Sequence, residues 1–509
     1  MTAHSRWLIQ DSSSTDQLLD QFKQKFTLEP MFIRHETLTF FDDFEWHLWR
    51  KNQLLASNNR DSILLVNTSE LTFFENEPSP VFATNIDHPT LQEHLLTVTK
   101  GRRLFPMAEL EVEFCNYAVR NKDLKKVCDL NIILTGFGTM IELKGLRGYD
   151  KEYRRSLKII QRKKPDQLDH HIFHNSLNLL GIRPSDYRAR PQYHLKPELD
   201  SGDATALVAQ KLWHNVRINE EGIIRDWDAQ FLQQYRVAIR RMRALFSQMK
   251  QSIGHEESNW FKTRLVQLAE PTSRMRDLDV YLKSEAEYTR LIPESFHEGL
   301  HQLFKDLSRE RQQAHRVLAQ HLKSPSYKSQ ISLLESRLAL CPQAATKKGH
   351  KAIQQVAAQR IIKRYNSICL DAIGINNQTP DEQIHEIRLG CKKLRYLLEF
   401  FGELFPKKQT KPMLKALKRL QDNLGQFNDY SVQRESLDHY LSSHSVTPEI
   451  EAAVSALNGV LFNKQKEERA KVRDQLDDFL NQTIRSCAES LLTSHTARSN
   501  KAKKGSLTS

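Results

Sequence analysis

One short segment of the chain carries cations at a spacing that suits the binding of a polyanion. Arg388, Lys392 and Arg395 recur about one helical turn apart within residues 384–398. At 100° per residue these three side chains share one face of a helix, while apolar residues occupy the opposite face. A row of like charges repels itself and costs helix stability. The row therefore indicates an anion-binding face, and the alternative is a solvated basic face.

The same pattern occurs earlier in the chain. Residues 232–246 superpose on 384–398 with an offset of 152, which aligns Arg236 with Arg388 and Arg240 with Lys392. The same offset places 275–280 on 427–432. Two separate matches at one offset indicate a duplicated helical unit with about four helices in each half. We expect a pseudo-twofold arrangement to bring the two basic faces to one cleft.

The type of polyanion follows from what the basic faces lack. Proteins that bind nucleic acids interleave aromatic residues for stacking, and only Tyr396 lies beside these faces. A phosphate chain without bases offers charge and oxygen acceptors, which Arg and Lys match. His385 adds a pH-sensitive donor, or alternatively caps or packs the helix. The candidate polyphosphate-binding residues are Arg236, Arg240, Arg241, Arg243, His385, Arg388, Lys392, Lys393 and Arg395.

The charge of the chain is unevenly distributed. Its 509 residues have a net charge of +13, enough length for two to four domains, and 39% hydrophobic residues. Residues 1–160 hold 20 Lys and Arg against 22 Asp and Glu, so a net charge of +15 lies in residues 161–509. The elements that position the basic faces therefore belong to the second part of the chain.

Hydrophobic periodicity divides the chain into two structural classes. Residues 1–160 alternate strand patterns with two short helical ones, at 15–26 and 90–99, and are expected to be α+β. An Arg-, Pro- and Tyr-rich stretch over 183–197 predicts the domain boundary. Helical periodicity then continues from about 205 to 493. The tail 494–509 is basic and is expected to be disordered. The strand patterns cover 37–41, 62–66, 71–74, 110–114 and 131–134.

Several classes of protein find no support in the sequence. Six scattered cysteines without a C-x-x-C pair favour a reducing compartment. No apolar run is long enough to span a bilayer and the first residues lack the pattern of a signal peptide, so we expect a cytoplasmic protein without membrane contact. The signatures of P-loop, Rossmann and serine-hydrolase sites are missing. His170, His171 and His174 include a zinc-compatible pair, but a surface histidine cluster is the favoured interpretation.

The helical region resembles a known family. Residues 384–396 are similar to the signature helix of the CHAD domain, with the pattern H-x-x-R-x-x-x-[RK]-[RK]-x-R, and 233–243 resemble its first copy. Residues 276–280 are similar to another element of the family. The resemblance implies an all-α domain of two four-helix repeats around a basic channel that binds inorganic polyphosphate, including that of polyphosphate granules. Gln233 stands where the family has its first histidine.

The N-terminal region resembles a degenerate CYTH domain, the triphosphate tunnel metalloenzyme fold. Residues 40–50, 109–114, 141–144 and 186–193 are similar to its conserved segments. The resemblance implies an antiparallel, tunnel-barrel-like α+β domain over 1–200, followed by the CHAD domain over 205–493. The two repeats are expected over about 205–340 and 350–493.

The chemistry of that tunnel requires carboxylates on one face of a strand to hold a divalent metal. Glu109, Glu111 and Glu113 have the period-two spacing for this role. The alternative is the solvated face of an edge strand. The opening Glu-x-Glu-x-Lys strand has no counterpart, because residues 4–9 supply no acid. We therefore expect no catalysis by this domain, with Mg²⁺ or Mn²⁺ required only if it is active. The alternatives are a metal-dependent triphosphatase or cyclase and a nucleic-acid-binding protein.

Overall fold

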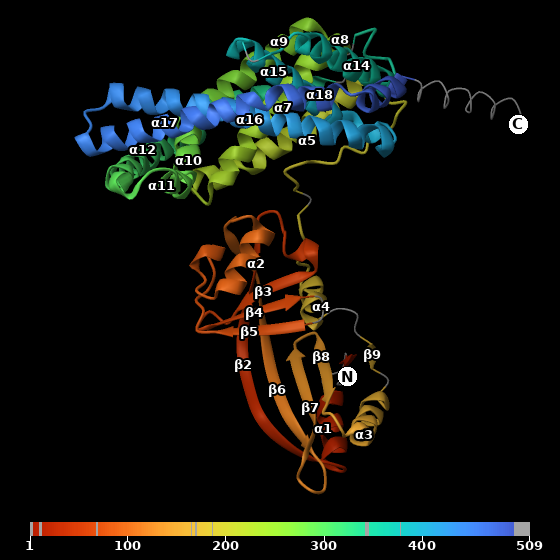
Figure 1. Cartoon of the computed structure of the whole chain (residues 1–509). Coiled ribbons are helices and arrows are strands. Elements are labelled where there is room, and N and C mark those ends of the chain that lie inside the picture. Colours follow the sequence, from red (N-terminus) through yellow and green to blue (C-terminus); the bar gives the residue numbers. More distant parts are fainter. Residues whose placement is uncertain are drawn as a thin grey trace, which may run out of the picture. The chain divides into compact units, whose positions relative to one another are not determined.

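The computed structural model describes residues 4–9, 13–67, 70–163, 165–167, 171–185, 187–341, 346–376 and 378–492. The chain divides into two compact units, Met1–Arg188 and Ala189–Ser509 (Figure 1). The predicted basic tail over 494–509 lies outside the described residues, as does His170. In the described ranges no helix combines the length and the hydropathy needed to cross a membrane.

The first unit is an α+β domain built on one sheet. The strands are β1 (His4–Ile9), β2 (Thr27–Asp43), β3 (Gln53–Ser57), β4 (Ser62–Asn67), β5 (Glu70–Glu75), β6 (Leu104–Arg120), β7 (Lys126–Thr135), β8 (Gly138–Gly145) and β9 (Asp166–Gln167). The helices are α1 (Ser13–Lys23), α2 (Pro89–Thr99), α3 (Asp150–Gln161) and α4 (Ile172–Leu179). The five predicted strand segments and both predicted helices are present, so the α+β prediction is confirmed.

The predicted closure of this sheet into a tunnel-like barrel is wrong. The described strands follow the order β5-β4-β3-β2-β6-β7-β8-β1-β9, and all pairs are antiparallel. β5 and β9 form the two edges and do not pair with each other within the described residues. β1 pairs with β8 and β9, so it adds to one end of the sheet instead of joining the strands at the other end.

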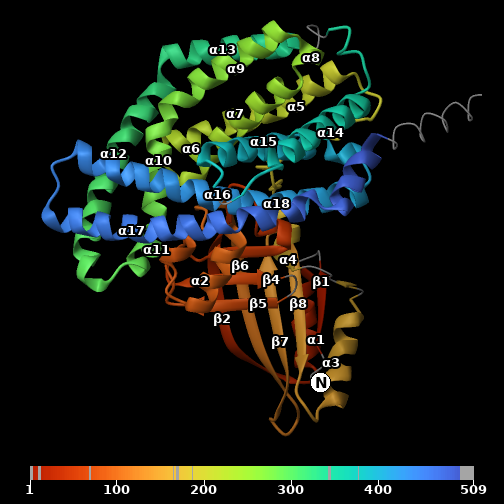
Figure 2. The same cartoon turned by 45° about the horizontal axis from the view of Figure 1, so that its top comes forward.

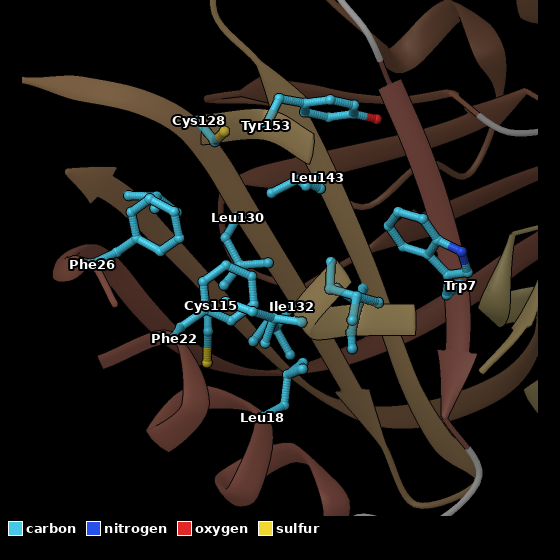
Figure 3. Packing of buried hydrophobic residues seen from close by; sticks show 14 of the residues in the cluster. Trp7, Leu18, Phe22, Phe26, Cys115, Cys128, Leu130, Ile132, Leu143 and Tyr153 are labelled. Carbon is cyan, nitrogen blue, oxygen red and sulfur yellow. The ribbon is translucent and has the colours of Figure 1, made fainter. Parts of the chain in front are cut away.

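Two apolar clusters lie on opposite faces of the sheet. Neighbouring residues of β7 point to opposite faces of the sheet, so Ile132 belongs to one cluster and Ile133 to the other. On the first face, Leu18 and Phe22 of α1 pack on the strands together with residues of α3 (Figure 3). On the second face, Phe173 of α4 packs against strand residues that include Phe40, with the rings 5.4 Å apart.

The second unit is helical. Its helices are α5 (Ser201–Ile218), α6 (Glu220–Ile224), α7 (Ala229–Gln248), α8 (Lys250–Ile253), α9 (His255–Ala269), α10 (Ser273–Lys283), α11 (Glu285–Leu291), α12 (His297–Lys323), α13 (Pro325–Leu340), α14 (Ile353–Ala372), α15 (Asp381–Phe401), α16 (Lys407–Ser443), α17 (Pro448–Ala470) and α18 (Val472–Leu480). Residues 482–492 are also helical. Short 3₁₀ turns occur at Trp49–Lys51 and Ala83–Asn85 in the first unit and at Glu270–Thr272, Glu294–Phe296 and Gly402–Leu404 in the second.

The helices repeat with the offset found in the sequence. α5 and α14, α7 and α15, and α9 and α16 each begin 152 residues apart. Backbone bonds near the start of the two halves obey the same relation, because Ser201 N–H donates to Lys351 O at 2.9 Å and Ile353 N–H donates to Leu199 O at 2.8 Å. These two bonds are exchanged by a rotation that swaps the halves. They are the pair of bonds that the predicted pseudo-twofold arrangement requires at this position.

The two halves of the helical unit pack through apolar residues of α12 and α17. At one position of α12 this packing leaves no space for a side chain. Leu300 and Leu303 of α12 share a buried cluster with Val454 and Leu457 of α17. At Gly299 in α12, an added Cβ would lie 2.0 Å from Glu449 O, a backbone atom at the start of α17. The approach of these two helices therefore depends on a residue without a side chain.

Replacing this glycine tests the packing of the two halves. Gly299→Ala should lower the free energy of unfolding by about 2 kcal/mol, because the rigid backbone of α17 must move away from the new methyl group. Gly459→Ala is the matched control, since Gly459 is an exposed position of α17 with nothing within 4 Å of an added Cβ. Urea denaturation followed by circular dichroism distinguishes them, and equal stability of the two variants would contradict the close approach.

Candidate anion-binding site

Helices α7 and α15 position the two basic faces. The Asp228 side chain accepts the Gln230 N–H at 2.8 Å and begins α7, while Asp381 and Glu382 lie in the first turn of α15, where the helix dipole favours acids. The predicted apolar faces are buried, with Tyr235, Ile239, Met242 and Phe246 in α7 and Ile387, Cys391, Leu394 and Leu398 in α15. Because these apolar faces are buried, the basic side chains on the opposite faces of α7 and α15 point away from the apolar core.

The two helices contact each other in the middle of the helical unit (Figure 2). A pocket of about 350 Å³ lies along them. Arg240 and Arg241 of α7 line it together with Arg388, Lys392 and Arg395 of α15. Further lining comes from α7, α15, α16 and the loop before α5: Gln233, Gln234, Val237, Tyr396, Glu399, Gln421, Asp422, Gly425, Ala189 and Arg190. Five of the nine predicted residues thus share one pocket.

Two cations of this pocket, Arg388 and Lys392, are partly withdrawn from water, and neighbouring positive charges disfavour their charged forms. Burial lowers the pKa of Lys392 from 10.5 to about 8, with further contributions from Arg388 and Arg240. Burial also lowers the pKa of Arg388. The negative charge of Asp429 partly offsets this shift, with its Oδ1 atom 3.6 Å from Arg388 Nη2. Within the described residues neither Arg240 nor Lys392 makes a hydrogen bond or ion pair. This cluster of positive charge is therefore stabilised by any anion that enters it.

The cluster extends beyond the pocket through the first repeat. Burial lowers the pKa of Arg236 and of Arg276, and the charge of Arg240 lowers both further. The two repeats reproduce one pairing, because Asp277 faces Arg236 as Asp429 faces Arg388. Arg240 is thus close enough to interact electrostatically with cations of both repeats.

Three of the predicted cations are held by neighbouring groups of the protein. Arg236 Nη1 donates to Ala269 O at 3.0 Å and to the hydroxyls of Thr272 and Ser273. Arg241 is 7% exposed and donates to Ala189 O and to Glu399. Arg395 donates to Glu399 at 2.8 Å and to Gln421 at 3.0 Å. These arginines contribute charge but have fewer donors left for a ligand.

The other predicted residues lie outside the pocket lining. Arg243 and His385 are exposed, and Lys393 is half-buried. A hydrogen bond of 3.0 Å joins His385 Nδ1 to Asn428 Oδ1, which places the histidine at the junction of α15 and α16. Gln233, which replaces the first histidine, does line the pocket.

Sequence reasoning missed several residues of the site. Arg276 and Asp429 belong to the repeated segments 275–280 and 427–432, so the repeat itself was the signal that pointed to them. Arg190 lies in the Arg- and Pro-rich stretch and lines the pocket from a loop. Tyr396 lines it as well, and its ring stacks on Phe400 with centroids 6.2 Å apart.

In the first unit, the three candidate carboxylates do not form a metal site. Glu109 and Glu111 are exposed, and Glu113 is half-buried with His35 at 3.6 Å. Their strand β6 lies between β2 and β7, so it is central and not an edge strand. Within the described part of the chain, no three His, Cys, Asp or Glu side chains are grouped as metal ligands would be.

Other polar residues of the first unit are committed to internal contacts. Glu142 in β8 accepts Arg6 Nε at 2.8 Å and Asn131 Nδ2 at 2.9 Å, one with each carboxylate oxygen. His171 and His174 are buried in and next to α4, which corrects the prediction of a surface cluster. Burial lowers the pKa of His171 to about 3, so its ring is neutral.

Comparison with known proteins identifies the helical region. Residues 207–438 match the model of a protein family, the CHAD domain. This region is a CHAD domain. The match begins within α5 and ends within α16, so it includes α7 and α15 with both basic faces. It lies entirely within the second structural unit.

Two solved structures are similar to the chain. The crystal structure of the CHAD domain from the plant Ricinus communis has 23% identity and a TM-score of 0.47, and the match covers 57% of this chain and 96% of that one. PptA from Streptomyces chartreusis has 13% identity and a TM-score of 0.42, with 54% and 99% of the two chains covered. No curated protein matches the chain.

The charge cluster of the CHAD domain has a consequence for stability. The folded pKa of Lys392 lies below its unfolded value, so the unfolded chain binds more protons between about pH 8 and pH 10.5. Stability contributed by this residue therefore rises with pH across that window. Lys392→Met should stabilise the protein by roughly 1–2 kcal/mol at pH 7, after allowance for its partial exposure, and by almost nothing at pH 10.5.

Urea denaturation of both proteins at the two pH values measures this effect. The exposed Lys328 provides the control, because Lys328→Met removes a charge from α13, outside the cluster. A Lys392→Met variant that is no more stable than this control at pH 7 would contradict the electrostatic cost assigned to the cluster.

Proposed function

We propose that the CHAD domain binds inorganic polyphosphate in the pocket between α7 and α15 and that this binding involves no catalysis. One observation carries the proposal: Arg240 of the first repeat meets Arg388 and Lys392 of the second in one pocket, where burial and the charge of Arg240 lower the pKa of both. The positive charges gain stability when negatively charged oxygens replace the lost water.

The length of the cationic row favours a polymer over a single phosphate. The charge of Arg240 acts on Arg236 and Arg276 in the first repeat and on Arg388 and Lys392 in the second, so one cation interacts with two others in each repeat. A chain of linked phosphates engages these groups in succession, each through charge-assisted hydrogen bonds. Arg190 and Arg395 at the pocket lining supply further positive charge in the same volume.

The lining favours a chain without bases over a nucleic acid. Tyr396 is the aromatic residue of the lining within the described residues, and its ring already stacks on Phe400. Nucleic acids gain affinity from successive aromatic platforms, which this pocket does not supply. A volume of about 350 Å³ suits a narrow phosphate chain better than nucleotides with their bases.

The first unit fits an accessory role as a degenerate CYTH-like domain over residues 1–200. Arg6 occupies the strand where the related fold carries acids, and it pairs with Glu142. Glu109 and Glu111 are exposed on a sheet that does not close. These features support a domain that supplies no metal chemistry. The cysteines Cys115, Cys128, Cys341, Cys369, Cys391 and Cys487 are free, which fits the reducing cytoplasm.

Charge reversal of the cluster tests the proposed binding. The double variant Arg240→Glu/Lys392→Glu should weaken binding of long-chain polyphosphate by at least about a hundredfold, because it replaces two attractive charges by two repulsive ones. The dependence of affinity on salt should also become less steep, since fewer ions are displaced. Isothermal titration calorimetry at several salt concentrations measures both effects.

Matched controls separate this site from general basicity. Lys328→Glu, an exposed position of α13, should leave the affinity within about twofold. Competition with single-stranded RNA of equal charge tests the preference for polyphosphate. An assay of phosphate release from tripolyphosphate with Mg²⁺ or Mn²⁺ tests for catalysis. Equal affinity for the RNA would contradict a polyphosphate site, and phosphate release lost in Glu109→Gln/Glu111→Gln would establish an enzyme instead.

The pH dependence of binding tests the role of Lys392. A bound phosphate chain raises the Lys392 pKa from about 8, so binding requires proton uptake at higher pH. Affinity should be constant below pH 7.5 and fall by about thirtyfold between pH 7 and pH 9.5. Lys392→Arg keeps the charge over this range and should remove most of the dependence. A wild-type affinity that does not change with pH would contradict the assignment of this amine to the site.

A further inference from the structure

Strand β2 has a long free edge. Its residues Thr27–Asp43 pair with β6 along almost their whole length, whereas β3 pairs only with Thr39–Phe41. Over residues 27–38, no described strand lies along the other side of β2 (Figure 1). An edge of this kind presents backbone donors and acceptors that can pair with another strand.

The side chains along this edge are apolar and exposed. Met31, Phe32 and Ile33 are 56%, 41% and 50% exposed. Successive residues of a strand point to opposite faces, so the exposure of both Phe32 and Ile33 leaves the two faces uncovered at this point. An exposed run of apolar residues on a free edge is unfavourable in water and favours association.

The two ends of the free edge carry opposite charge. At the start of β2, the exposed Lys25 lies beside the β6–β7 turn, which carries the exposed Lys122 and Lys125 against one exposed acid, Asp123. At the other end, the edge borders a hollow of about 1000 Å³ with an excess of acids. The acids in its lining are Glu36, Asp61, Glu75, Glu111 and Glu113, against Arg34 and Arg60.

We infer that a second copy of this chain pairs with the free edge of β2, antiparallel and with a twofold axis near Phe32. In this register the start of β2 in one copy lies beside Thr37 of the other, so the basic end meets the acidic hollow at both ends of the interface. Opposite charges then face each other twice, and Met31 lies across from Ile33. A parallel arrangement places like charges together and is disfavoured.

The strand pairing between the two copies is limited to a short segment of β2. The irregularity in the β2–β6 pairing between Pro30 and Phe32, together with the missing N–H of Pro30, interrupts a regular edge ladder. Such features oppose indefinite strand stacking. The expected product is a closed dimer, because a twofold axis uses the same edge of both copies.

Sedimentation equilibrium of the full chain and its variants tests the dimer. The wild-type protein should be a dimer at micromolar concentration, and Phe32→Lys/Ile33→Lys should raise the dimer dissociation constant by at least about tenfold. Ile373→Lys is the matched control, because Ile373 is 74% exposed at the end of α14, in the other unit. Circular dichroism of each variant verifies that it is folded.

A charge exchange tests the antiparallel register without altering the apolar residues. Lys25→Glu/Lys125→Glu and Glu36→Lys/Asp61→Lys should each weaken the dimer, and the two sets combined in one chain should restore it. A monomeric wild-type protein, or equal weakening by Ile373→Lys, would overturn the proposal. A combined variant no more dimeric than either set alone would overturn the antiparallel register.

Discussion

The helical unit depends on the cost of holding Arg388 and Lys392, which are partly withdrawn from water, beside the positive charge of Arg240. Charges of one sign within a few ångströms raise one another's free energy, and burial increases the effect because the local dielectric response is weaker. Such a cluster persists only when packing elsewhere holds it in place. The buried apolar faces of α7 and α15 supply that packing, and an anion in the pocket recovers the electrostatic cost.

Duplication explains how the cluster forms and why it is not symmetric. The exchanged bonds at Ser201 and Ile353 follow the 152-residue relation, and the equivalent basic helices α7 and α15 contact each other. Later divergence has given equivalent residues different surroundings. Arg236 donates to Ala269 O and the two neighbouring hydroxyls, while Arg388 has a more distant ion pair with Asp429 and a buried Nε without a partner in the described structure. Arg388 therefore keeps more donors for a ligand than Arg236 does.

Much of the candidate site was visible in the sequence, and what was missed has a physical cause. The apolar and basic faces of α7 and α15 follow from helical periodicity, and the 152-residue repeat predicted their meeting. Arg241 donates hydrogen bonds to Ala189 O and to Glu399, which are far from it in the sequence, so no local pattern predicted these bonds. In the first unit, alternation identified the strands. Whether the sheet closes depends on which strand β1 joins, and no local pattern encodes that choice.

Direct titration of the Lys392 amine tests the central claim that this cluster is a site for condensed phosphate. Nuclear magnetic resonance of the lysine side chains, assigned with the Lys392→Arg variant, measures the pKa with and without saturating tripolyphosphate. We expect a pKa of about 8 in the free protein, rising toward the ordinary value of 10.5 or above when the anion binds. An ordinary pKa in the free protein, or one that the anion does not change, would contradict it.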